Sequence, residues 1–562
     1  MNLQNKLLYK FLILGVLFLM VSCQKQGETA DLIVENSVIW TGNENHPYAE
    51  AMAIKGDSIL AIGTNEEILK LKGDQTELLN AEGKFITPGF IDAHVHLIDG
   101  GFNLLSIQLR DAKSPEEFIN RIKLYAEKAE PGIWIVGGSW DHKNWGDEVP
   151  TLSWIDSVTT KNPVLLYRLD GHMALANSLA INKAGIDKNT KDVEGGVIVR
   201  DKNGEPTGIF KDQATGLIIN KIPLPSDKQA DEALVAAMNF VASKGITSVH
   251  EMWSPYATEV YESAFKRAHE NKSLITRVCV KGALSNWKEI KEKIEKDGVG
   301  DHWLKFDGVK GYVDGSLGSH TAAFHEPFLD KPNEKGIFIQ TEEDLYNWIS
   351  NADKAGLQIA IHAIGDRANN FILNTFERVA KENGGRDRRF RIEHAQHLNA
   401  NDIARFSTLK VIPSMQPYHA IDDGRWAEQV IGAERIKTTY AFNSLFNSSA
   451  TVAFGSDWPV APAIPLEGIY AAVTRRTLDD ENPDGWVPEQ KITVEQALTA
   501  FTKNAAYTSF EEHKKGTLEK GKLADFIVID DELTKMDPTK IRDAKILQTY
   551  VGGKKVFDIS KE

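Results

Sequence analysis

The sequence is poor in cysteine, with only Cys23 and Cys279 among 562 residues. This count excludes a disulfide framework and any zinc site built from cysteine ligands. Basic residues are also in deficit, because 65 lysines and arginines stand against 79 aspartates and glutamates. The formal net charge of −14 argues against a surface for nucleic acid or anionic membranes, and it mainly keeps a protein soluble.

Long apolar runs are lacking as well, apart from a short one near the N-terminus. Residues 11–20 are apolar except for one glycine, which is shorter than the roughly 20 residues of a transmembrane helix and typical of a secretory signal. The run ends at Ser22-Cys23 and resembles a bacterial lipoprotein signal. The resemblance implies a signal peptide over 1–22 and a lipid on Cys23. We expect an exported chain that is lipid-anchored to the bacterial cell envelope, at the outer membrane or periplasmic face. A plain secretory signal cleaved nearby is the alternative.

The two ends of the mature chain share one pattern. Short alternating apolar segments separated by turn residues occur at 32–34, 38–40, 51–54 and 59–62, and again over 516–530 and 549–557. Neither end has enough apolar strand for a core of its own. We therefore expect residues 23–85 and 506–562 to form one small β-sandwich.

Between these ends, strand-like runs with polar tips alternate with helical stretches such as 233–244 and 342–355. The runs are 86–96, 246–251, 277–282, 308–314, 357–362, 390–394, 411–416 and 451–457. Alternation of this kind predicts a parallel sheet, and eight strands are the number of a TIM-like (β/α)₈ barrel. The fold class is therefore α/β, with the barrel over 86–505.

The segment from about 104 to 232 is left over and must be an insertion after the first barrel strand. It holds strand-like runs at 134–138 and 164–169 and a hairpin over 195–210 that turns at 201–204. An insertion at this point would cover the C-terminal face of the barrel as a lid.

Metal-ligating residue types gather at the strand tips. His94 and His96 are two residues apart, so a strand would aim both imidazoles at one point. A His-x-His alone also fits two histidines with ordinary hydrogen bonds, so the residues at the other strand tips decide between this interpretation and a metal site. These add Lys310, His362, His394 and Asp457. Such a set can converge on a point about 4 Å across, which is enough for two metal ions.

The sequence here resembles the amidohydrolase superfamily of metal-dependent barrels. Within it, the chain looks like the amidohydrolase-3 group, with the YtcJ-like proteins and N-substituted formamide deformylase. The matching phrases span about 32–557 and include ITPGFIDAHVH, GVKGYVDGSLGSHTA, AIHAIGDRA, RIEHAQ, FGSDWPV and GTLEKGKLADFIVID.

The resemblance implies the metal ligands. His94 and His96 would bind one ion together with Asp457, and His362 and His394 would bind the second. Lys310 matches a lysine that is carboxylated by CO₂ in many family members and bridges the two ions. The alternative is an ion pair between Lys310 and Asp314, or another carboxylate, beside a single ion. Imidazole and oxygen ligands favour Zn²⁺, with Fe, Mn, Ni or Co as alternatives.

The predicted reaction is hydrolysis of a C–N bond in an amide, N-formyl or N-acyl group of a small, partly apolar substrate. Metal-activated hydroxide would attack the carbonyl, with Asp457 as general base and then general acid. Hydrolysis of a lactone, ester or phosphoester at the same site is the alternative within enzymes. The alternative outside enzymes is a lipoprotein that binds a metal and a solute without catalysis, although such a protein would not need Asp457 as a proton shuttle.

Aromatic and polar residues near turns are predicted to contact the substrate. They are Trp140, Asp170, His172, Arg367 and Trp458. Trp253, like Trp458, sits just beyond a strand tip. Each tryptophan taken singly also fits core packing, and Arg367 also fits a structural pair with Asp366. The expected partner is a small molecule and no nucleic acid, and a homodimer is left open.

Overall fold

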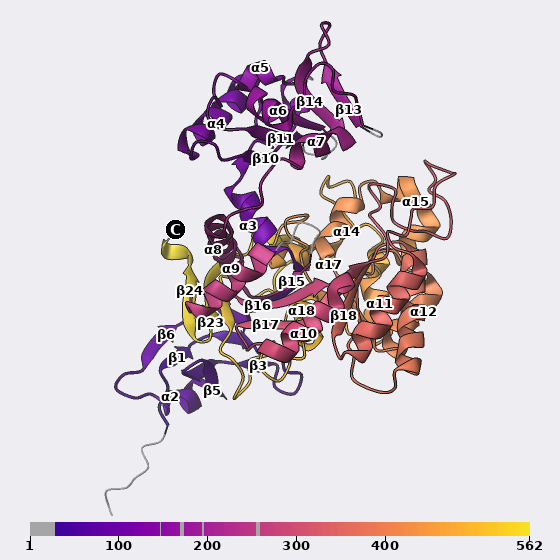
Figure 1. Ribbon diagram of the computed structural model, residues 1–562. Helices are drawn as coiled ribbons and strands as arrows, with labels where there is room; N and C mark the ends of the chain where they lie inside the picture. The colour runs from indigo at the N-terminus through magenta and orange to yellow at the C-terminus, as the bar shows by residue number, and fades with distance from the viewer. Residues whose placement is uncertain (1–27, 147, 169–172, 194–195, 254–258, 562) are drawn as a thin grey trace, which may run out of the picture.

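The computed structural model describes residues 28–146, 148–168, 173–193, 196–253 and 259–561. Its centre is a sheet of eight parallel strands that curls into a nearly closed barrel (Figure 1). In order around the sheet these are β8 (Phe90–Val95), β15 (Ile246–Met252), β16 (Arg277–Ala283), β17 (Leu304–Tyr312), β18 (Gln358–Ala363), β19 (Arg391–His394), β20 (Ile412–Met415) and β21 (Ala453–Phe454). A parallel bridge between Val95 and Trp458 joins the first and last strands. The predicted (β/α)₈ barrel is confirmed.

Helices pack around this barrel and bury their apolar stripes against it. They are α8 (Asp227–Ser243), α9 (Glu259–Glu270), α10 (Trp287–Asp297), α11 (Glu342–Lys354), α12 (Asp366–Glu382), α13 (Ile403–Thr408), α14 (Pro417–Asp423), α15 (Ala427–Arg435), α16 (Phe442–Asn447), α17 (Pro465–Thr474), α18 (Val494–Phe501) and α19 (Lys503–Thr508). The predicted helix over 233–244 begins earlier, at Asp227, because Ser226 and Gln229 form a capping box there. None of the described helices is long and apolar enough to span a membrane.

Two further sheets form the β-sandwich. One is built from the N-terminal segment alone, with strands β5 (Ser58–Gly63), β4 (Ala51–Lys55), β1 (Leu32–Glu35) and β6 (Glu77–Asn80), next to the short helix α2 (Asn65–Leu69). The other combines both ends of the chain, in the order β24 (Lys554–Asp558), β23 (Ile546–Val551), β22 (Phe526–Ile529), β7 (Phe85–Pro88), β2 (Val38–Trp40) and β3 (Tyr48–Ala49). The expected sandwich from both termini is therefore present.

The predicted first strand over 86–96 is in fact two strands in two sheets. β7 pairs with β22 in the sandwich, whereas β8 pairs with β15 in the barrel. The division falls at Gly89, where an added Cβ would lie 2.2 Å from Thr247 Cγ2. Only glycine can occupy such a close approach. A buried bidentate ion pair between Arg277 of β16 and Asp525 beside β22 also joins barrel to sandwich.

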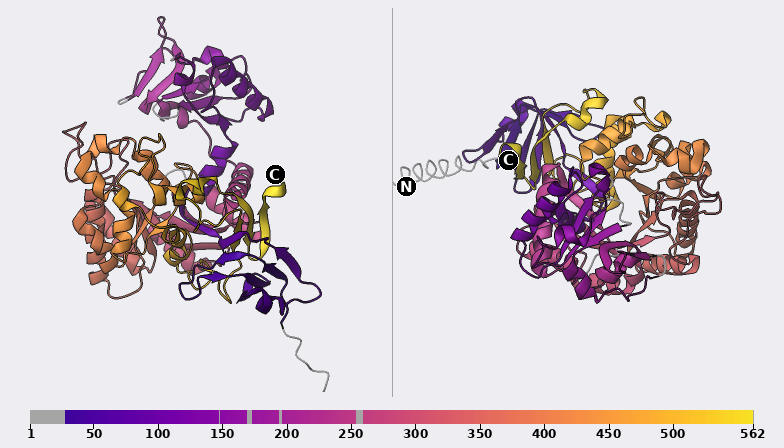
Figure 2. Two further views of the ribbon diagram at one scale, coloured as in Figure 1. Left: turned by 180° about the vertical axis from the view of Figure 1, so that it is seen from behind. Right: turned by 90° about the horizontal axis from the view of Figure 1, so that it is seen from above.

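The insertion forms a unit with its own sheet and its own apolar cores. Its strands are β13 (Gly196–Arg200), β14 (Pro206–Asp212), β12 (Met173–Ala176), β11 (Val164–Arg168), β10 (Ile135–Trp140) and β9 (Ile107–Gln108), with helices α4 (Pro115–Lys128), α5 (Leu152–Ile155), α6 (Ser178–Ala184) and α7 (Gly216–Ile219). The predicted hairpin is β13–β14. The unit is joined to the barrel through α3 (Leu97–Leu105) and α8. The insertion stands above the end of the barrel at which β8 terminates, and it lies over one side of that end (Figure 2).

Candidate metal centre

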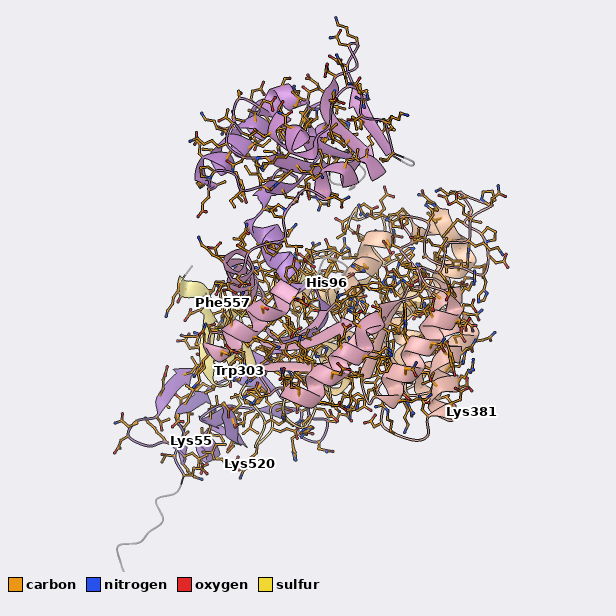
Figure 3. All side chains as sticks on the ribbon, in the orientation of Figure 1. Lys55, His96, Trp303, Lys381, Lys520 and Phe557 are labelled. Carbon is orange, nitrogen blue, oxygen red and sulfur yellow. The ribbon has the colours of Figure 1, made fainter. Side chains whose placement is uncertain are left out.

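The six predicted ligands lie at the carboxyl ends of the barrel strands, on the side that carries the insertion. They are His94 in β8, His96 at the start of α3, Lys310 in β17, His362 in β18, His394 at the end of β19 and Asp457 after β21. Figure 3 shows His96 at the barrel end below the insertion. Carboxyl ends of parallel strands meet at one face, so residues far apart in sequence become neighbours.

Asp457 lies between His94 of β8 and His96 at the start of α3. Its Oδ1 is 3.4 Å from His94 Nε2 and 3.3 Å from His96 Nε2. Lys310 Nζ lies 3.4 Å from the same nitrogen of His94. The ring centroid of His394 is 4.9 Å from that of His94. Ligand atoms of His94, His394 and Asp457 all lie within 4.8 Å of one another, which is close enough to hold one ion.

His362 occupies a slightly different position in the cluster. Its ring centroid is 4.5 Å from that of His394, as expected for a pair sharing an ion. Its Nε2, however, lies 3.1 Å from the carbonyl oxygen of Gly315. The structure therefore brings all six predicted ligands together around the group of His94, His394 and Asp457. The arrangement with two ions stays a prediction.

Three of the four histidines have their Nδ1 atom fixed by an oxygen acceptor. In each case Nδ1 carries the proton and donates it, so the lone pair of Nε2 is left for a metal. The acceptors are Glu393 Oε2 for His94 at 2.6 Å, the Met252 carbonyl for His96 at 2.9 Å and Gln416 Oε1 for His394 at 2.8 Å. Sequence reasoning missed these supporting residues, although Glu393 stands directly before His394.

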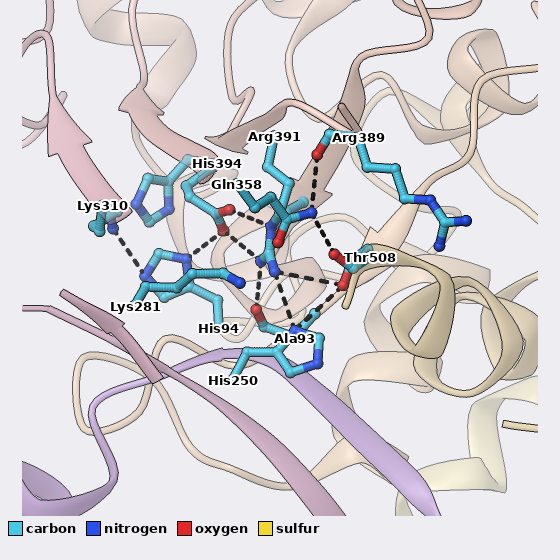
Figure 4. Close-up of polar contacts among 12 residues, drawn as sticks. Ala93, His94, His250, Lys281, Lys310, Gln358, Arg389, Arg391, His394 and Thr508 are labelled. Carbon is cyan, nitrogen blue, oxygen red and sulfur yellow. Dashed lines mark hydrogen bonds and ion pairs between the residues drawn. The ribbon is translucent and has the colours of Figure 1, made fainter. Parts of the chain in front are cut away.

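Glu393 is in turn held by the guanidinium of Arg391, and both side chains are fully buried. Figure 4 shows Arg391 close to His94 and Ala93. Arg391 Nε donates to Glu393 Oε1 at 2.7 Å, and its Nη2 donates to the Ala93 carbonyl at 2.6 Å and to Ser414 Oγ at 3.0 Å. Burial by itself raises the pKa of Glu393, but the Arg391 charge and the bond from His94 outweigh it and hold that pKa well below its usual range. The carboxylate is therefore ionised and fixes the His94 ring.

Burial also sets the charge of the cluster. It lowers the pKa of His94 to about 4 and that of His362 to about 3, with the Lys310 charge adding to both shifts. These imidazoles are neutral near pH 7, which is the state that binds a metal. Burial likewise lowers the pKa of Lys310 to about 8. The donor set thus fits a divalent cation.

Two of the predicted ligands have backbone conformations that L-residues rarely adopt. The φ angles are 74° at His394 and 62° at Asp457. Positions of this kind cost on the order of 1–3 kcal/mol each and persist only where surrounding contacts impose them. At Asp457 the contact is a bond from its N–H to the His94 carbonyl at 2.7 Å. The two ligands are therefore positioned by the backbone as well as by their side chains.

Removing the charge of Glu393 should weaken metal binding. In Glu393→Gln the acceptor for His94 becomes neutral, so we expect the affinity for Zn²⁺ to fall by about 10–100-fold. Competition with a chromogenic chelator measures the affinity. Glu511→Gln is the matched control, because Glu511 is also buried but pairs with Lys515 at 2.9 Å. Unchanged affinity in Glu393→Gln, or an equal loss in the control, would contradict this role.

Among the described residues, Lys310 does not pair with Asp314, which was one form of the alternative for Lys310. Both carboxylate oxygens of Asp314 accept backbone N–H groups, from Ala323, Ile364 and Gly365, at 2.8–3.0 Å. Lys310 Nζ instead lies near His94 and 4.7 Å above the ring of Tyr312. Asp314 therefore shapes the loops after β17 and β18.

Of the five residues predicted to contact the substrate, the structure describes Trp140, Arg367 and Trp458, and the recorded contacts of these three side chains are with residues other than the six predicted ligands. Trp140 is fully buried in the core of the insertion, where its Nε1 donates to the Leu166 carbonyl at 2.8 Å. Trp458 is also buried and stacks on Phe240 at 5.1 Å. Both tryptophans pack as core residues, which corrects the predicted position at the substrate. Asp170 and His172 lie outside the described residues.

Arg367 also lies apart from the histidines. Its guanidinium covers the ring of Phe338 at 4.4 Å, and one nitrogen is 3.7 Å from Glu342 Oε1. The considered pair with Asp366 is not formed, because Asp366 accepts the backbone N–H of His325 instead. These contacts give Arg367 a structural position at the start of α12.

A cavity of about 490 Å³ opens beside the cluster, next to Lys310 and His362. Its walls include Trp253, Tyr312 and Trp348. Among these, Tyr312 could have been found from sequence, because it stands two residues after Lys310 and shares its strand face. Trp348 comes from α11 and carries no such signal.

Comparison with known proteins gives long matches. A profile described as the amidohydrolase family matches residues 77–557. Protein LONG AFTER FAR-RED 3 of Arabidopsis thaliana is 41% identical over 544 residues, covering 94% of this chain and 92% of that protein. Putative amidohydrolase YtcJ of Bacillus subtilis is 31% identical, covering 93% and 98%. N-substituted formamide deformylase of Arthrobacter pascens is 26% identical, covering 93% and 97%.

The fold is shared with a solved structure over nearly the same length. The crystal structure of an uncharacterized metal-dependent hydrolase from Pyrococcus horikoshii superposes with a TM-score of 0.76 at 28% identity, covering 90% of this chain and 99% of that one. The likeness extends over the barrel, the sandwich and the insertion together, since so little of either chain is left unmatched.

Proposed function

This chain belongs to the amidohydrolase family, and from that premise we propose that it hydrolyses the carbon–nitrogen bond of an amide, N-formyl or N-acyl group in a small substrate. The observation that carries the proposal is the set of three imidazoles, of His94, His96 and His394, whose Nδ1 atoms are all fixed by oxygen acceptors, beside the carboxylate of Asp457. Such a set binds a divalent cation at the Nε2 atoms. The similarity to a formamide deformylase supports the C–N bond as the one that is cleaved.

The ligands would be His94, His96, His362, His394 and Asp457, with Zn²⁺ favoured over Fe, Mn, Ni or Co by the nitrogen and oxygen donors. A bound cation would acidify the attacking water and polarise the substrate carbonyl. Asp457 Oδ1 lies on the ligand side of both His94 and His96. Asp457 accepts the proton of the water as it attacks and delivers it to the departing nitrogen, acting as base and then as acid.

We further propose that Lys310 is carboxylated. Its uncharged amine attacks CO₂, a nitrogen–carbon bond forms, and one proton leaves to solvent, so that an anionic carbamate replaces the amine. The support is geometric. Lys310 Nζ is buried at the cluster and its polar neighbour is His94 Nε2. An ammonium group would repel a cation there, whereas a carbamate is an oxygen ligand for two ions.

Removal of metal tests the reaction directly. Dialysis against a chelator should abolish hydrolysis of N-formyl and N-acyl amines, and Zn²⁺ should restore it. The assay panel includes a lactone, an aryl ester and a phosphotriester. Turnover of only those compounds would mean that the protein cleaves an ester or phosphoester bond and not a C–N bond. Metal binding without turnover of any compound would favour the binding lipoprotein.

The N-terminal segment, which lies outside the described residues, is proposed to anchor the mature chain by lipid at Cys23. In Cys23→Ser the acceptor sulfur is lost, so the protein should remain unprocessed or move from the membrane fraction to the soluble fraction. Fractionation and mass spectrometry of the mature N-terminus measure this, with Cys279→Ser as the matched control. A mature chain that begins elsewhere and carries no lipid would disprove the anchor.

A further inference from the structure

His250 is a fully buried residue of β15 that does not belong to the ligand cluster. Its Nδ1 lies 3.1 Å from Nη1 of Arg391 in β19. β15 and β19 stand four strands apart in the sheet of eight, so this contact crosses the interior of the barrel. Two residues further along β15, the Met252 carbonyl accepts the proton of His96. The strand that supports His96 therefore also contributes a buried imidazole to the barrel interior.

The hydrogen bond between Arg391 and His250 has only one possible direction. A guanidinium donates and never accepts, so His250 Nδ1 accepts from Arg391 and carries no proton itself. Thr508 Oγ1 lies 3.3 Å from the same nitrogen, but its hydroxyl donates to the nearer Ala505 carbonyl at 2.7 Å. Arg391 is therefore the donor that the imidazole receives.

The other nitrogen of this ring gains nothing from its position. The ring proton is on Nε2, which is buried and has no hydrogen-bond partner among the described residues. Burial holds the pKa of His250 well below its usual range, and the charges of Arg391, Lys281 and Lys515 add to that shift, so the ring is neutral. A buried N–H without a partner is unfavourable and calls for an explanation. The explanation here is that the bond at Nδ1 decides where the ring lies.

Arg391 connects this imidazole to a predicted metal ligand. Figure 4 shows His250 and His94 on two sides of the Arg391 guanidinium. The guanidinium donates through Nε and Nη2 to the two oxygens of Glu393, at 2.7 and 3.1 Å. Glu393 Oε2 in turn accepts from His94 Nδ1 at 2.6 Å. All four side chains are buried, where hydrogen bonds between charged groups are strong and directional. A rotation of the guanidinium would therefore disturb the carboxylate that orients His94.

We infer that His250 positions the metal ligand His94 from a distance, through the buried arginine–glutamate pair between them. The lone pair of His250 Nδ1 holds the guanidinium of Arg391 in the orientation in which it grips the carboxylate. His250 contacts neither substrate nor metal in this role. The inference rests on the proposed function only for the metal bound at the ligand cluster, and it is independent of the bond that is hydrolysed.

Removal of the acceptor tests this role. In His250→Leu, Arg391 Nη1 loses its partner on this side, so we expect the affinity for Zn²⁺ to fall by about 10-fold, the lower end of the cost of losing a supporting residue. The visible absorption spectrum of the Co²⁺-loaded protein should also shift, because that spectrum reports the geometry of the ligands. Competition with a chromogenic chelator measures the affinity. Unchanged affinity and spectrum in a folded His250→Leu would overturn the inference.

Two amide variants identify the atom of the ring that matters. The Oδ1 of asparagine can accept a hydrogen bond at the place of Nδ1, so His250→Asn should keep the affinity and the spectrum of the wild-type protein. The amide of glutamine reaches the place of Nε2 instead, so His250→Gln should lose affinity as His250→Leu does. This pair also provides the test if His250→Leu does not fold. An equal loss in the asparagine and glutamine variants would contradict the role of Nδ1.

Ser248→Ala is the control for a general loss of stability. Ser248 lies two residues before His250 in β15, and its Oγ accepts from Lys515 Nζ at 2.7 Å. Loss of this buried bond should lower the melting temperature and leave the affinity for Zn²⁺ and the Co²⁺ spectrum unchanged. If the control weakens metal binding as much as His250→Leu does, the effect of His250 is on stability alone and the inference fails.

A double variant tests the route from His250 to the metal. If His250 acts through Glu393, His250→Leu should add almost nothing to the loss of Zn²⁺ affinity in Glu393→Gln. Losses that add in the double variant would mean that His250 acts by another route, and the inference would be withdrawn.

Metal binding separates this inference from the proposed function, because neither the affinity nor the Co²⁺ spectrum requires turnover. If the protein hydrolyses no amide but shows the expected shifts in His250→Leu and His250→Gln, the inference holds and the proposed function alone fails. If metal-dependent amide hydrolysis is found while Zn²⁺ affinity and the spectrum are independent of His250, the proposed function stands and the inference is disproved.

Discussion

In Asp457→Asn, kcat for the best amide substrate is expected to fall by about 10²–10⁴-fold while the bound metal is largely retained. Asparagine keeps the size and one oxygen ligand but cannot accept a proton, and this range is the usual share of general acid–base catalysis. The position of Asp457 supports its proposed role as the general base, because its Oδ1 lies within 3.4 Å of Nε2 of both His94 and His96. Steady-state kinetics together with elemental analysis of metal content measure the two effects separately.

The split between rate and metal content is what makes this variant informative. A fall in rate that matches a fall in metal content would mean that Asp457 is a ligand alone. His94→Ala is the comparison, since it removes an imidazole and should lose metal and activity together. Hydrolysis by Asp457→Asn at the wild-type rate would show that another group takes the proton, and the proposed mechanism would be withdrawn.

The second large effect is expected for Lys310→Ala. If the carbamate joins two ions, its loss should remove at least one equivalent of metal. Activity should then fall by more than the roughly 10–100-fold that loss of a supporting residue costs. Acetate, propionate or bicarbonate should restore part of the activity by supplying a carboxylate in the vacated space. Metal equivalents per chain and kcat with and without added acid are the measurements.

Lys281→Met provides the matched control for that experiment. Lys281 is a buried lysine in the neighbouring strand β16, and it pairs with Asp307 rather than with a histidine. The control should keep its metal and gain nothing from acetate. Full metal content and full activity in Lys310→Ala would exclude a bridging role and leave a centre with one ion.

The barrel and the convergence of the six predicted ligands were predictable because both depend on local sequence. Buried parallel strands are short apolar runs, and the ligands follow each run directly, so topology alone brings His94 and Asp457 together. The change of sheet at Gly89 was not predictable, because apolar residues continue through it and the contact that demands glycine comes from Thr247. The positive φ of His394 is likewise imposed by its surroundings.

The substrate side was less predictable for a related reason. A tryptophan near a turn has the same sequence signal whether it lines a cavity, as Trp253 does, or fills a core, as Trp140 does. Only the packing of the insertion around Trp140 distinguishes the two cases. Trp348 belongs to a helix whose pattern indicates burial, and its place at the cavity follows from how α11 packs beside β17 and β18.

The pairing of β7 with β22 has a consequence for the time at which the protein acquires its metal. β7 leads directly into β8 and His94, yet its sheet partner lies almost at the end of the chain. A ribosome delivers the first histidines long before that partner, and contacts between such distant segments form late in folding. A nascent chain therefore has histidines but no shaped cage around them. We therefore expect loading with metal to be a late step of maturation, after β7 has paired with β22.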